Sequence, residues 1–192
     1  MTGARLWWVR HGPTHARAMV GWTDLPADLS DQTRLDRLSA YLPAQATIVS
    51  SDLDRARATA DALAAGRRRL PHMRDLREMH FGTWENRTFA DVEAEDPDGI
   101  FRFWDAPGET RAPRGESWND LAARVGAAAD RLAETGGDIV VVAHFGAILS
   151  QVARARGLSA KDAFAQHIDN LSVTVIDHAG GTLTAAPVNH VP

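Results

Sequence analysis

Apolar and polar residues follow two different patterns along the chain, of which one predicts strands and the other predicts helices. Short apolar runs that end abruptly, at residues 6–9, 47–50 and 138–144, are typical of buried strands. Between them, leucine, valine and alanine recur every three or four positions, which is the spacing of one face of an amphipathic helix. Strands and helices that alternate in this way favour a parallel sheet with helices on both of its faces.

The helix-like stretches are bounded by residues that commonly begin or end helices. Ser30 is the predicted N-cap of the first helix, and Pro43 is predicted to stop that helix. Ser51 and Ser117 each open a capping-box pattern, with an aspartate three residues later. The predicted helices lie, in order, between Ser30 and Pro43, between Ser51 and Gly66, over residues 88–95 and 98–104, between Ser117 and Gly136, through residues 148–157, and over residues 159–166.

Further segments complete the predicted sheet and its loops. Residues 72–76 are a strand candidate, while 171–177 and 183–188 alternate around a glycine-containing turn and predict a hairpin. The arginine run at 67–69 is predicted to be a solvated loop, and the long polar segment 15–29 a functional loop. We therefore expect an α/β fold, a doubly wound three-layer α/β/α sandwich with a mostly parallel central sheet.

Composition and charge narrow the class of protein. The hydrophobic share of 44% and the charged share of 24% are ordinary for a globular chain, and we expect a single domain over residues 1–192. A net charge of −4 argues against nucleic acid or an anionic membrane as partner, and no apolar run is as long as a membrane span. The chain has no cysteine and no signal-peptide pattern, so we expect a cytoplasmic protein; its oligomeric state stays open.

Five polar side chains follow predicted strands, at the sheet edge where open α/β folds bind ligands. They are Arg10 and His11 after the first strand, Arg55 after the second, Glu78 after the third and His144 after the fourth. Two guanidiniums and the N–H groups of a following helix suit a tetrahedral oxyanion such as phosphate. The neutral imidazole of His11 can attack phosphorus directly, and Glu78 can protonate the leaving alkoxide. This chemistry needs no metal and no cofactor.

These residues lie within short motifs. In chain order the motifs are Arg10-His11-Gly12-Pro13-Thr14, Ser50-Ser51-Asp52-Leu53-Asp54-Arg55-Ala56, Leu76-Arg77-Glu78-Met79-His80-Phe81-Gly82-Thr83-Trp84-Glu85, Gly115-Glu116-Ser117 and Val142-Ala143-His144-Phe145-Gly146. Together they resemble the signature of the histidine phosphatase superfamily, also called the phosphoglycerate mutase-like family. The resemblance implies a mixed α/β sandwich in which His11 is the phosphorylated nucleophile. It implies that Arg10, Arg55 and His144 bind the phosphoryl group, and that Glu78 is the proton donor and then the base for water.

Two positions depart from the family pattern. Many members carry asparagine six residues beyond the nucleophile, where it contacts phosphate. Here that position is Arg17, which the resemblance implies as a phosphate-binding residue; it either supplies a further cation to the phosphate or turns out toward solvent. Asn86 replaces a glycine after Trp84-Glu85, in a turn that asparagine tolerates because it adopts left-handed backbone.

The resemblance leaves several activities open. The segment between Glu78 and Gly115 is short, and the chain stops soon after its last predicted strand. With neither a long insertion nor a long tail to cover it, the site is less shielded from water than in the mutases of the family. Such a site favours hydrolysis of a small phosphorylated metabolite over transfer to a second substrate oxygen. The layout is most similar to the α-ribazole phosphatase-type branch. The alternatives are phosphoglycerate mutase-type transfer, a catalytically silent phosphate-binding protein, and metal-assisted hydrolysis through His11 and His144.

Other conspicuous side chains are predicted to serve packing or to lie at the surface. Trp7 and Trp8 adjoin on one strand and must face opposite sides, and both are expected in the core. His15 lies in the loop beside the predicted site and is a candidate for specificity. Packing is also expected for most of Met19, Trp22, His80, Trp84, Phe101, Phe103 and Trp104, and no metal site for His72, His167, His178 and His190.

Overall fold

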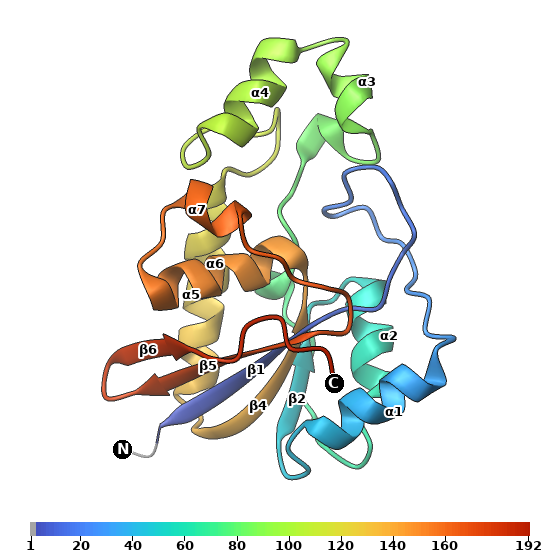
Figure 1. Ribbon diagram of the computed structural model, residues 1–192, viewed down its shortest axis with the longest axis vertical. Helices are drawn as coiled ribbons and strands as arrows, with labels where there is room; N and C mark the ends of the chain where they lie inside the picture. The colour runs from blue at the N-terminus through green and yellow to red at the C-terminus, as the bar shows by residue number, and fades with distance from the viewer. Residues whose placement is uncertain (1–2) are drawn as a thin grey trace.

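The computed structural model describes residues 3–192 and is built on one six-stranded sheet (Figure 1). The strands are β1 (Ala4–Arg10), β2 (Thr47–Ser50), β3 (Arg68–Arg69), β4 (Gly137–Ala143), β5 (Val173–Ala179) and β6 (Thr182–Ala185). Their order is β3-β2-β4-β1-β5-β6; the first four run parallel, while β5 and β6 add an antiparallel edge. The predicted mostly parallel sheet and the predicted hairpin are confirmed.

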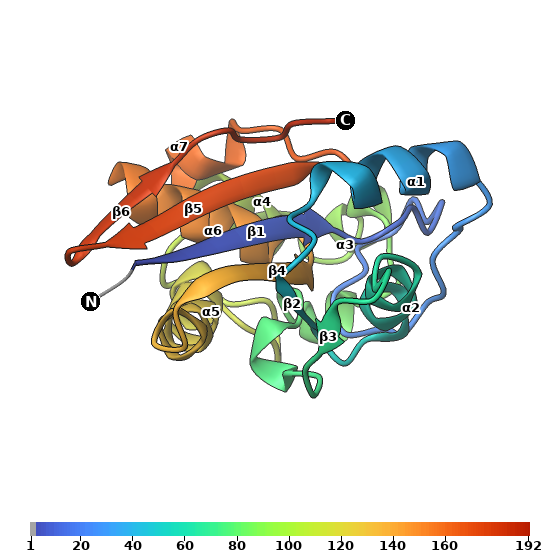
Figure 2. The same cartoon turned by 90° about the horizontal axis from the view of Figure 1, so that it is seen from below.

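Helices cover both faces of the sheet, as Figures 1 and 2 show. One face packs against α1 (Gln32–Tyr41) and α2 (Asp54–Ala62), in a cluster that includes Val9 and Val140. The other face packs against α5 (Trp118–Ala133) and α6 (Phe145–Arg156), in a cluster that includes Trp8. Alternate residues of β1 and β4 therefore pack into two separate hydrophobic cores, as expected for central strands buried on both sides. The predicted three-layer α/β sandwich is confirmed.

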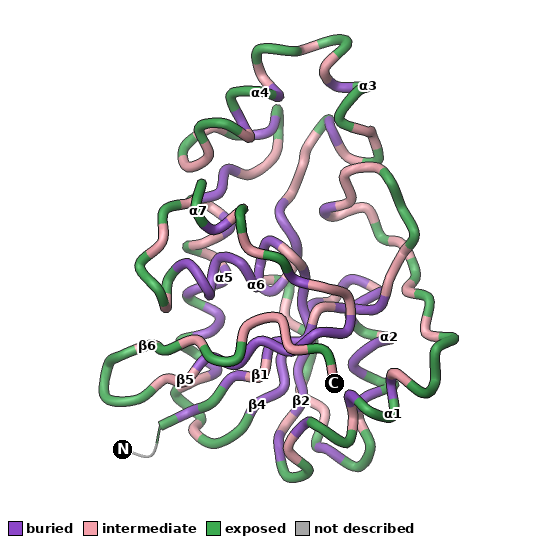
Figure 3. Tube along the Cα trace, in the orientation of Figure 1, coloured by how far each residue is buried: buried purple, intermediate pink, exposed green. Residues whose placement is uncertain are grey.

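Three further helices extend the α5–α6 side. They are α3 (Phe89–Glu93), α4 (Pro97–Asp105) and α7 (Ala160–Phe164). In Figure 1, α3 and α4 stand at one end of the molecule and α7 lies between α4 and α6. Figure 3 shows buried residues gathered in the strands and the helix faces against them, while exposed residues predominate along α3 and α4. None of the helices between residues 3 and 192 is long and apolar enough to cross a membrane.

The segment that contains residues 67–76 differs from the prediction. Arg68–Arg69 form the edge strand β3 instead of a solvated loop, and the Arg67 side chain is buried. The Arg67 guanidinium donates to backbone carbonyls near the ends of α1 and α2, among them those of Leu42 and Leu63. Those carbonyls have no partner within their own helices, and a five-donor guanidinium satisfies them. The strand predicted at 72–76 is also wrong, because this segment forms the 3₁₀ helix Arg74–Leu76.

Some local expectations were wrong by one residue or one contact. The side chain that caps α1 is Asp31, which accepts from the Arg34 N–H, and the predicted cap at Ser30 is wrong. Trp8 is fully buried as predicted, but Trp7 is only half-buried because its indole N–H reaches Asp138 at the sheet surface. Asn86 does adopt left-handed backbone, with φ of 58°. That the chain forms a single domain over residues 1–192 stays a prediction.

Candidate active site

The carboxyl ends of β1 and β4 lie side by side and bring the two motif histidines together. β1 ends at Arg10, and the N–H of the next residue, His11, donates to the carbonyl of Ala143 at the end of β4. His144 follows directly and is the N-cap residue of α6. The two imidazole rings lie 5.1 Å apart between centroids. The convergence expected from strand ends in the sequence is present in the fold.

A pocket of about 230 Å³ lies at this edge. Four of the five polar side chains predicted from the strand ends line it, namely Arg10, His11, Arg55 and Glu78. His144 is not among the lining residues; it is fully buried behind the His11 ring. The remaining walls come largely from apolar residues of the 12–30 loop and from Phe81 and Phe145.

The protonation of the His11 ring follows from its contacts. Its Nδ1 lies 2.6 Å from the carbonyl oxygen of Gly12, which can only accept, so Nδ1 carries the proton. Nε2 is therefore the unprotonated atom, and its lone pair accepts from the Nε–H of Arg55 at 3.3 Å. Burial, and then the positive charge of Arg55, lower the pKa of His11 to about 3. The ring is thus neutral at neutral pH, with Nε2 available as a nucleophile.

One buried guanidinium, that of Arg55, and one half-buried guanidinium, that of Arg10, flank this ring. Arg55 is only 1% exposed, and its terminal nitrogens donate to the carbonyls of Gly21 and Thr23 at 2.7 and 2.9 Å. Arg10 donates to the carbonyl of Ile168 at 2.6 Å, and its Nε finds no partner among residues 3–192. Burial lowers the pKa of both arginines from an ordinary value so high that both stay charged. Together they make a strongly positive, partly desolvated wall that suits an oxyanion.

His144 adds a buried polar atom to the same region. Its Nε2 lies 2.6 Å from the Ser51 hydroxyl oxygen, and its Nδ1 has no partner in the part of the chain that the structure describes. The Ser51 oxygen accepts from the Leu53 N–H, which leaves the hydroxyl hydrogen free to donate to His144. Burial, and then the charge of Arg55, hold the pKa of His144 well below its ordinary value. The predicted capping of α2 by Ser51 is wrong, because the Ser51 hydroxyl group contacts His144 and no side chain caps α2.

Glu78 reaches the pocket from an irregular segment between the 3₁₀ helices Arg74–Leu76 and Gly82–Trp84. Both of its carboxylate oxygens lie 3.1 Å from the N–H of Gly146 in the first turn of α6, and one accepts from the Met79 N–H. A Cβ on Gly146 would lie 2.6 Å from that carboxylate, so the approach requires glycine. Glu78 is 8% exposed, and its carboxyl group sits between the helix terminus and the pocket.

Glu85 is a supporting residue that the sequence analysis did not single out. Its carboxylate accepts from the backbone N–H groups of residues 21–23 and Phe81, and from the Thr23 hydroxyl. Although burial opposes ionisation, these hydrogen bonds lower the pKa of Glu85. The carbonyls of the same short loop hold Arg55, and the Trp22 indole N–H donates to the carbonyl of Glu78. The only sequence signal was its position in the Trp84-Glu85 motif.

Arg124 and Glu116 support the segment that carries Glu78. Arg124, on α5, donates to both carboxylate oxygens of Glu116 at 2.9 and 2.8 Å. The same guanidinium donates to the carbonyls of Asp75, Arg77 and Glu78. The Gly115-Glu116-Ser117 motif pointed to Glu116, but no motif pointed to Arg124. Four carbonyl and carboxylate partners thus replace the missing secondary structure around Glu78.

Other residues considered in the sequence lie away from the pocket or pack. Arg17 is exposed on the 12–30 loop and outside the pocket lining, so its role in phosphate binding stays a prediction. His15 is also exposed there and pairs with Asp28. Met19 lines the pocket, whereas Trp84 and Phe103 are buried in the core as expected. The contribution of Phe145, which lines the pocket, was missed.

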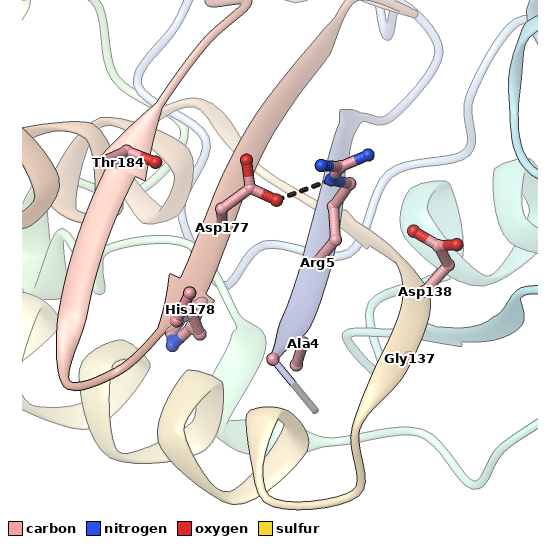
Figure 4. Close-up of a pocket in the computed structure, with 9 residues that line it drawn as sticks. Ala4, Arg5, Gly137, Asp138, Asp177, His178 and Thr184 are labelled. Atoms are coloured by element: carbon pink, nitrogen blue, oxygen red, sulfur yellow. Dashed lines mark hydrogen bonds and ion pairs between the residues drawn. The ribbon is translucent and has the colours of Figure 1, made fainter. Parts of the chain in front are cut away.

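A larger depression, of about 510 Å³, lies at the opposite end of the sheet (Figure 4). It adjoins the start of β1, roughly 20 Å from Arg10 at about 3.3 Å per strand residue. Arg5, its cation, is paired with Asp177, as Figure 4 shows. Within residues 3–192, no three His, Cys, Asp or Glu side chains are placed to hold a metal ion. This depression therefore lacks the two adjacent histidines and the pair of guanidiniums found at the other end.

Comparisons with known proteins agree with the motifs. Residues 6–190 match the family model described as the histidine phosphatase superfamily, branch 1. An adenosylcobalamin/alpha-ribazole phosphatase of Escherichia coli K12 is 30% identical over 183 residues, which cover 90% of this chain and 89% of that protein. The chain spans about half, 54%, of the length of a matched Mycobacterium tuberculosis protein named as bifunctional.

Solved structures agree with the fold as well. Bacillus stearothermophilus YhfR superposes with a TM-score of 0.90 at 29% identity, and the match covers 98% of each chain. A mycobacterial glucosyl-3-phosphoglycerate phosphatase superposes with a TM-score of 0.84 at 27% identity, covering 98% of this chain and 99% of that one.

Proposed function

The chain belongs to the histidine phosphatase superfamily, and from that premise we propose that it is a phosphomonoesterase acting on a small phosphorylated metabolite. The observation that carries this proposal is the state of His11, whose Nε2 is unprotonated and lies at the pocket beside the guanidiniums of Arg10 and Arg55. A neutral imidazole needs no general base before it attacks phosphorus. Positive groups fixed around that atom stabilise the charge that develops on the phosphoryl oxygens.

In the first step, the lone pair of His11 Nε2 forms a bond to phosphorus while the bond from phosphorus to the ester oxygen breaks. The ester oxygen takes a proton from Glu78, so that an alcohol leaves. Arg10 and Arg55, which line the pocket, bind the phosphoryl oxygens throughout. The short distance between His11 Nε2 and Arg55 Nε supports this, because the guanidinium lies beside the atom that would bond to phosphorus, within reach of the equatorial oxygens. That His144 also binds the phosphoryl oxygens, as the family resemblance implies, stays a prediction, because His144 does not line the pocket.

In the second step, the Glu78 carboxylate takes a proton from water, and the water oxygen forms the new bond to phosphorus. The bond between phosphorus and Nε2 breaks, its electron pair returns to the ring, and phosphate leaves. Glu78 regains the proton that it gave in the first step, so protons balance over the cycle. The scheme uses no metal and no cofactor.

Hydrolysis, rather than transfer to a second substrate, is supported by two similar proteins, one named an adenosylcobalamin/alpha-ribazole phosphatase and the other a glucosyl-3-phosphoglycerate phosphatase. Phosphoglycerate mutase-type transfer uses the same phosphohistidine and is the second candidate. The two are separated by supplying 3-phosphoglycerate with a bisphosphoglycerate primer. Isomer formation without phosphate release would refute the phosphatase. Phosphate binding without any turnover would instead indicate the catalytically silent protein. The cytoplasmic location stays a prediction.

The nucleophile is tested by trapping the intermediate. The wild-type protein, mixed with labelled nitrophenyl phosphate and quenched, should carry covalent label that is lost in acid and kept in alkali. His11→Ala should abolish both the label and turnover. His167→Ala, which changes an exposed histidine paired only with Asp169, is the matched control and should keep both. Label that persists in the His11 variant would refute the proposal.

The role of Glu78 as the general acid is tested by comparing esters that differ in their leaving group. Glu78→Gln should slow hydrolysis of alkyl phosphates far more than hydrolysis of nitrophenyl phosphate, because nitrophenolate leaves with little need of a proton. Rates that fall equally for both esters would show that Glu78 does not protonate the leaving oxygen.

A further inference from the structure

Trp22 links the short loop that holds Arg55 to the segment that carries Glu78. Its indole N–H donates to the carbonyl oxygen of Glu78 at 2.8 Å. Its two neighbours in the chain, Gly21 and Thr23, accept from the terminal nitrogens of Arg55 through their carbonyls. We propose, on the basis of the phosphatase function above, that Trp22 is a positioning residue, which fixes the Glu78 carboxyl group relative to the Arg55 guanidinium. One loop of three residues then places both the proton donor and a phosphate-binding cation.

The Trp22 ring contacts the chain on both sides of Glu78. The His80 ring stacks on the indole at 4.4 Å between centroids, with 27° between the two planes. The central carbon of the Arg77 guanidinium lies 4.9 Å from the centre of the indole. Residues 77–80 form neither a helix nor a strand, so their backbone has no ladder of hydrogen bonds to fix it. The contacts of this one side chain therefore help to hold the segment that bears the carboxyl group.

The backbone of the loop packs closely on the same segment and does not depend on the indole. A Cβ on Gly21 would lie 2.0 Å from the carbonyl oxygen of Met79, so this approach requires glycine. The backbone N–H of Trp22 donates to the Glu85 carboxylate at 2.7 Å. Because these contacts remain when the indole is replaced, a change of the Trp22 side chain should loosen the proton donor and leave the loop carbonyls around the phosphate-binding cation in place.

The position of Glu78 matters most where the leaving oxygen needs a proton. General acid catalysis contributes about 10²–10⁴-fold and requires the acid within hydrogen-bond distance of that oxygen. A displacement of about 1 Å at a reacting group can cost about 100-fold in rate. Trp22→Phe keeps an aromatic ring beside His80 and removes the N–H that holds the Glu78 carbonyl. This variant should therefore lose part of the acid catalysis that Glu78→Gln loses entirely.

The experiment measures kcat/KM, which reports the step that breaks the ester bond, for ethyl phosphate and for nitrophenyl phosphate. In Trp22→Phe we expect kcat/KM to fall about tenfold or more for ethyl phosphate but less than about threefold for nitrophenyl phosphate, whose leaving group has little need of a proton. The inhibition constant of inorganic phosphate should stay unchanged, because the carbonyls of Gly21 and Thr23 still hold Arg55. A residue with a merely structural role would slow both esters alike.

Trp7→Phe is the matched control for the loss of an indole N–H. Trp7 is also half-buried, and its indole N–H donates to Asp138 at 2.8 Å, outside the lining of the phosphate pocket. This variant should hydrolyse both esters as the wild-type protein does. If Trp22→Phe slows both esters equally, or slows neither, Trp22 does not position the acid and the proposal is overturned.

His80→Ala is the second variant, and it decides the matter if Trp22→Phe does not fold. It removes the ring that stacks on the indole and keeps the indole N–H, so it should also slow ethyl phosphate more than nitrophenyl phosphate, to a smaller extent. Equal slowing of both esters would then overturn the proposal. If the wild-type protein releases no phosphate and His11 takes no label, the phosphatase function has failed, and the role of Trp22 fails with it. If Glu78→Gln discriminates between the esters and Trp22→Phe does not, only the role of Trp22 has failed.

Discussion

Glu85→Gln tests whether one carboxylate organises the loop that holds Arg55. The carboxylate accepts five hydrogen bonds, at 2.7 to 3.1 Å, two on one oxygen and three on the other. Glutamine has the same shape, but only one of its two terminal atoms accepts. The orientation of the glutamine amide that keeps more hydrogen bonds points its oxygen at the three donors of Gly21 and Thr23. Its NH₂ group then faces the N–H groups of Trp22 and Phe81.

The expected cost follows from those two unpaired donors. A polar group left unsatisfied in a partly buried site costs about 1–3 kcal/mol, and the three bonds that remain lose the strength that the charge gave them. Glu85 is half-buried, so we expect the free energy of unfolding to fall by about 2–4 kcal/mol. For a chain of this size that lowers Tm by about 5–15 °C. Because Gly21 and Thr23 also anchor Arg55, the affinity for inorganic phosphate should fall as well.

The assay is urea unfolding at neutral pH, together with the inhibition constant of phosphate. Glu95→Gln is the matched control, since Glu95 pairs with Arg87 through a side chain that is 69% exposed. An exposed pair contributes at most about 1 kcal/mol, so this variant should behave much like the wild-type protein. If Glu85→Gln loses no more stability than Glu95→Gln and binds phosphate equally well, the assigned role of Glu85 is refuted.

Further predictions concern the pH dependence of stability, the residue that holds the Glu78 segment, a metal requirement and the charge of Arg17. The pKa of His11 is about 3 in the folded protein and near 6.5 when unfolded, so below pH 6.5 only the unfolded state binds this proton. Stability should therefore fall as pH drops from 6.5 toward 4, and His11→Gln should reduce that slope by up to about 1.4 kcal/mol per pH unit; an unchanged slope would contradict the assigned pKa. Arg124→Lys should slow alkyl esters more than nitrophenyl phosphate, since it loosens the segment of Glu78; equal slowing would indicate a purely structural role. Prolonged EDTA treatment should leave phosphate release unchanged, whereas loss that zinc restores would favour metal-assisted hydrolysis. Arg17→Ala should weaken phosphate inhibition severalfold if Arg17 binds the anion, and an unchanged constant would exclude it.

Much of this protein was predictable because the relevant signals are local. The two hydrophobic patterns identified the main strands and helices, since side-chain spacing reports directly on which face of an element is buried. The abrupt polar ends of β1 and β4 pointed to Arg10, His11 and His144, because parallel strands end at one edge. The capping box at Ser117 likewise depends on residues three positions apart, and it forms as predicted.

The errors arose where backbone groups from distant segments meet. Arg67 belongs to an arginine run of the kind that is typical of a solvated loop. Its side chain is nevertheless buried, because its guanidinium donates to backbone carbonyls near the ends of α1 and α2. Ser51 has the spacing of a cap, but His144 is a nearer partner for its hydroxyl group. No periodicity reports such contacts, because they depend on how whole elements pack.

The sequence by itself determined the alternating α/β architecture and the identity of the five polar residues at one sheet edge. Only the tertiary structure decided which nitrogen of His11 is free, since that depends on the carbonyl of Gly12 and the guanidinium of Arg55. It also decided that an irregular segment can hold Glu78, through the hydrogen bonds of Arg124. The physical reason is that hydrophobic pattern acts between near neighbours in the chain, whereas protonation and orientation depend on groups brought together by folding.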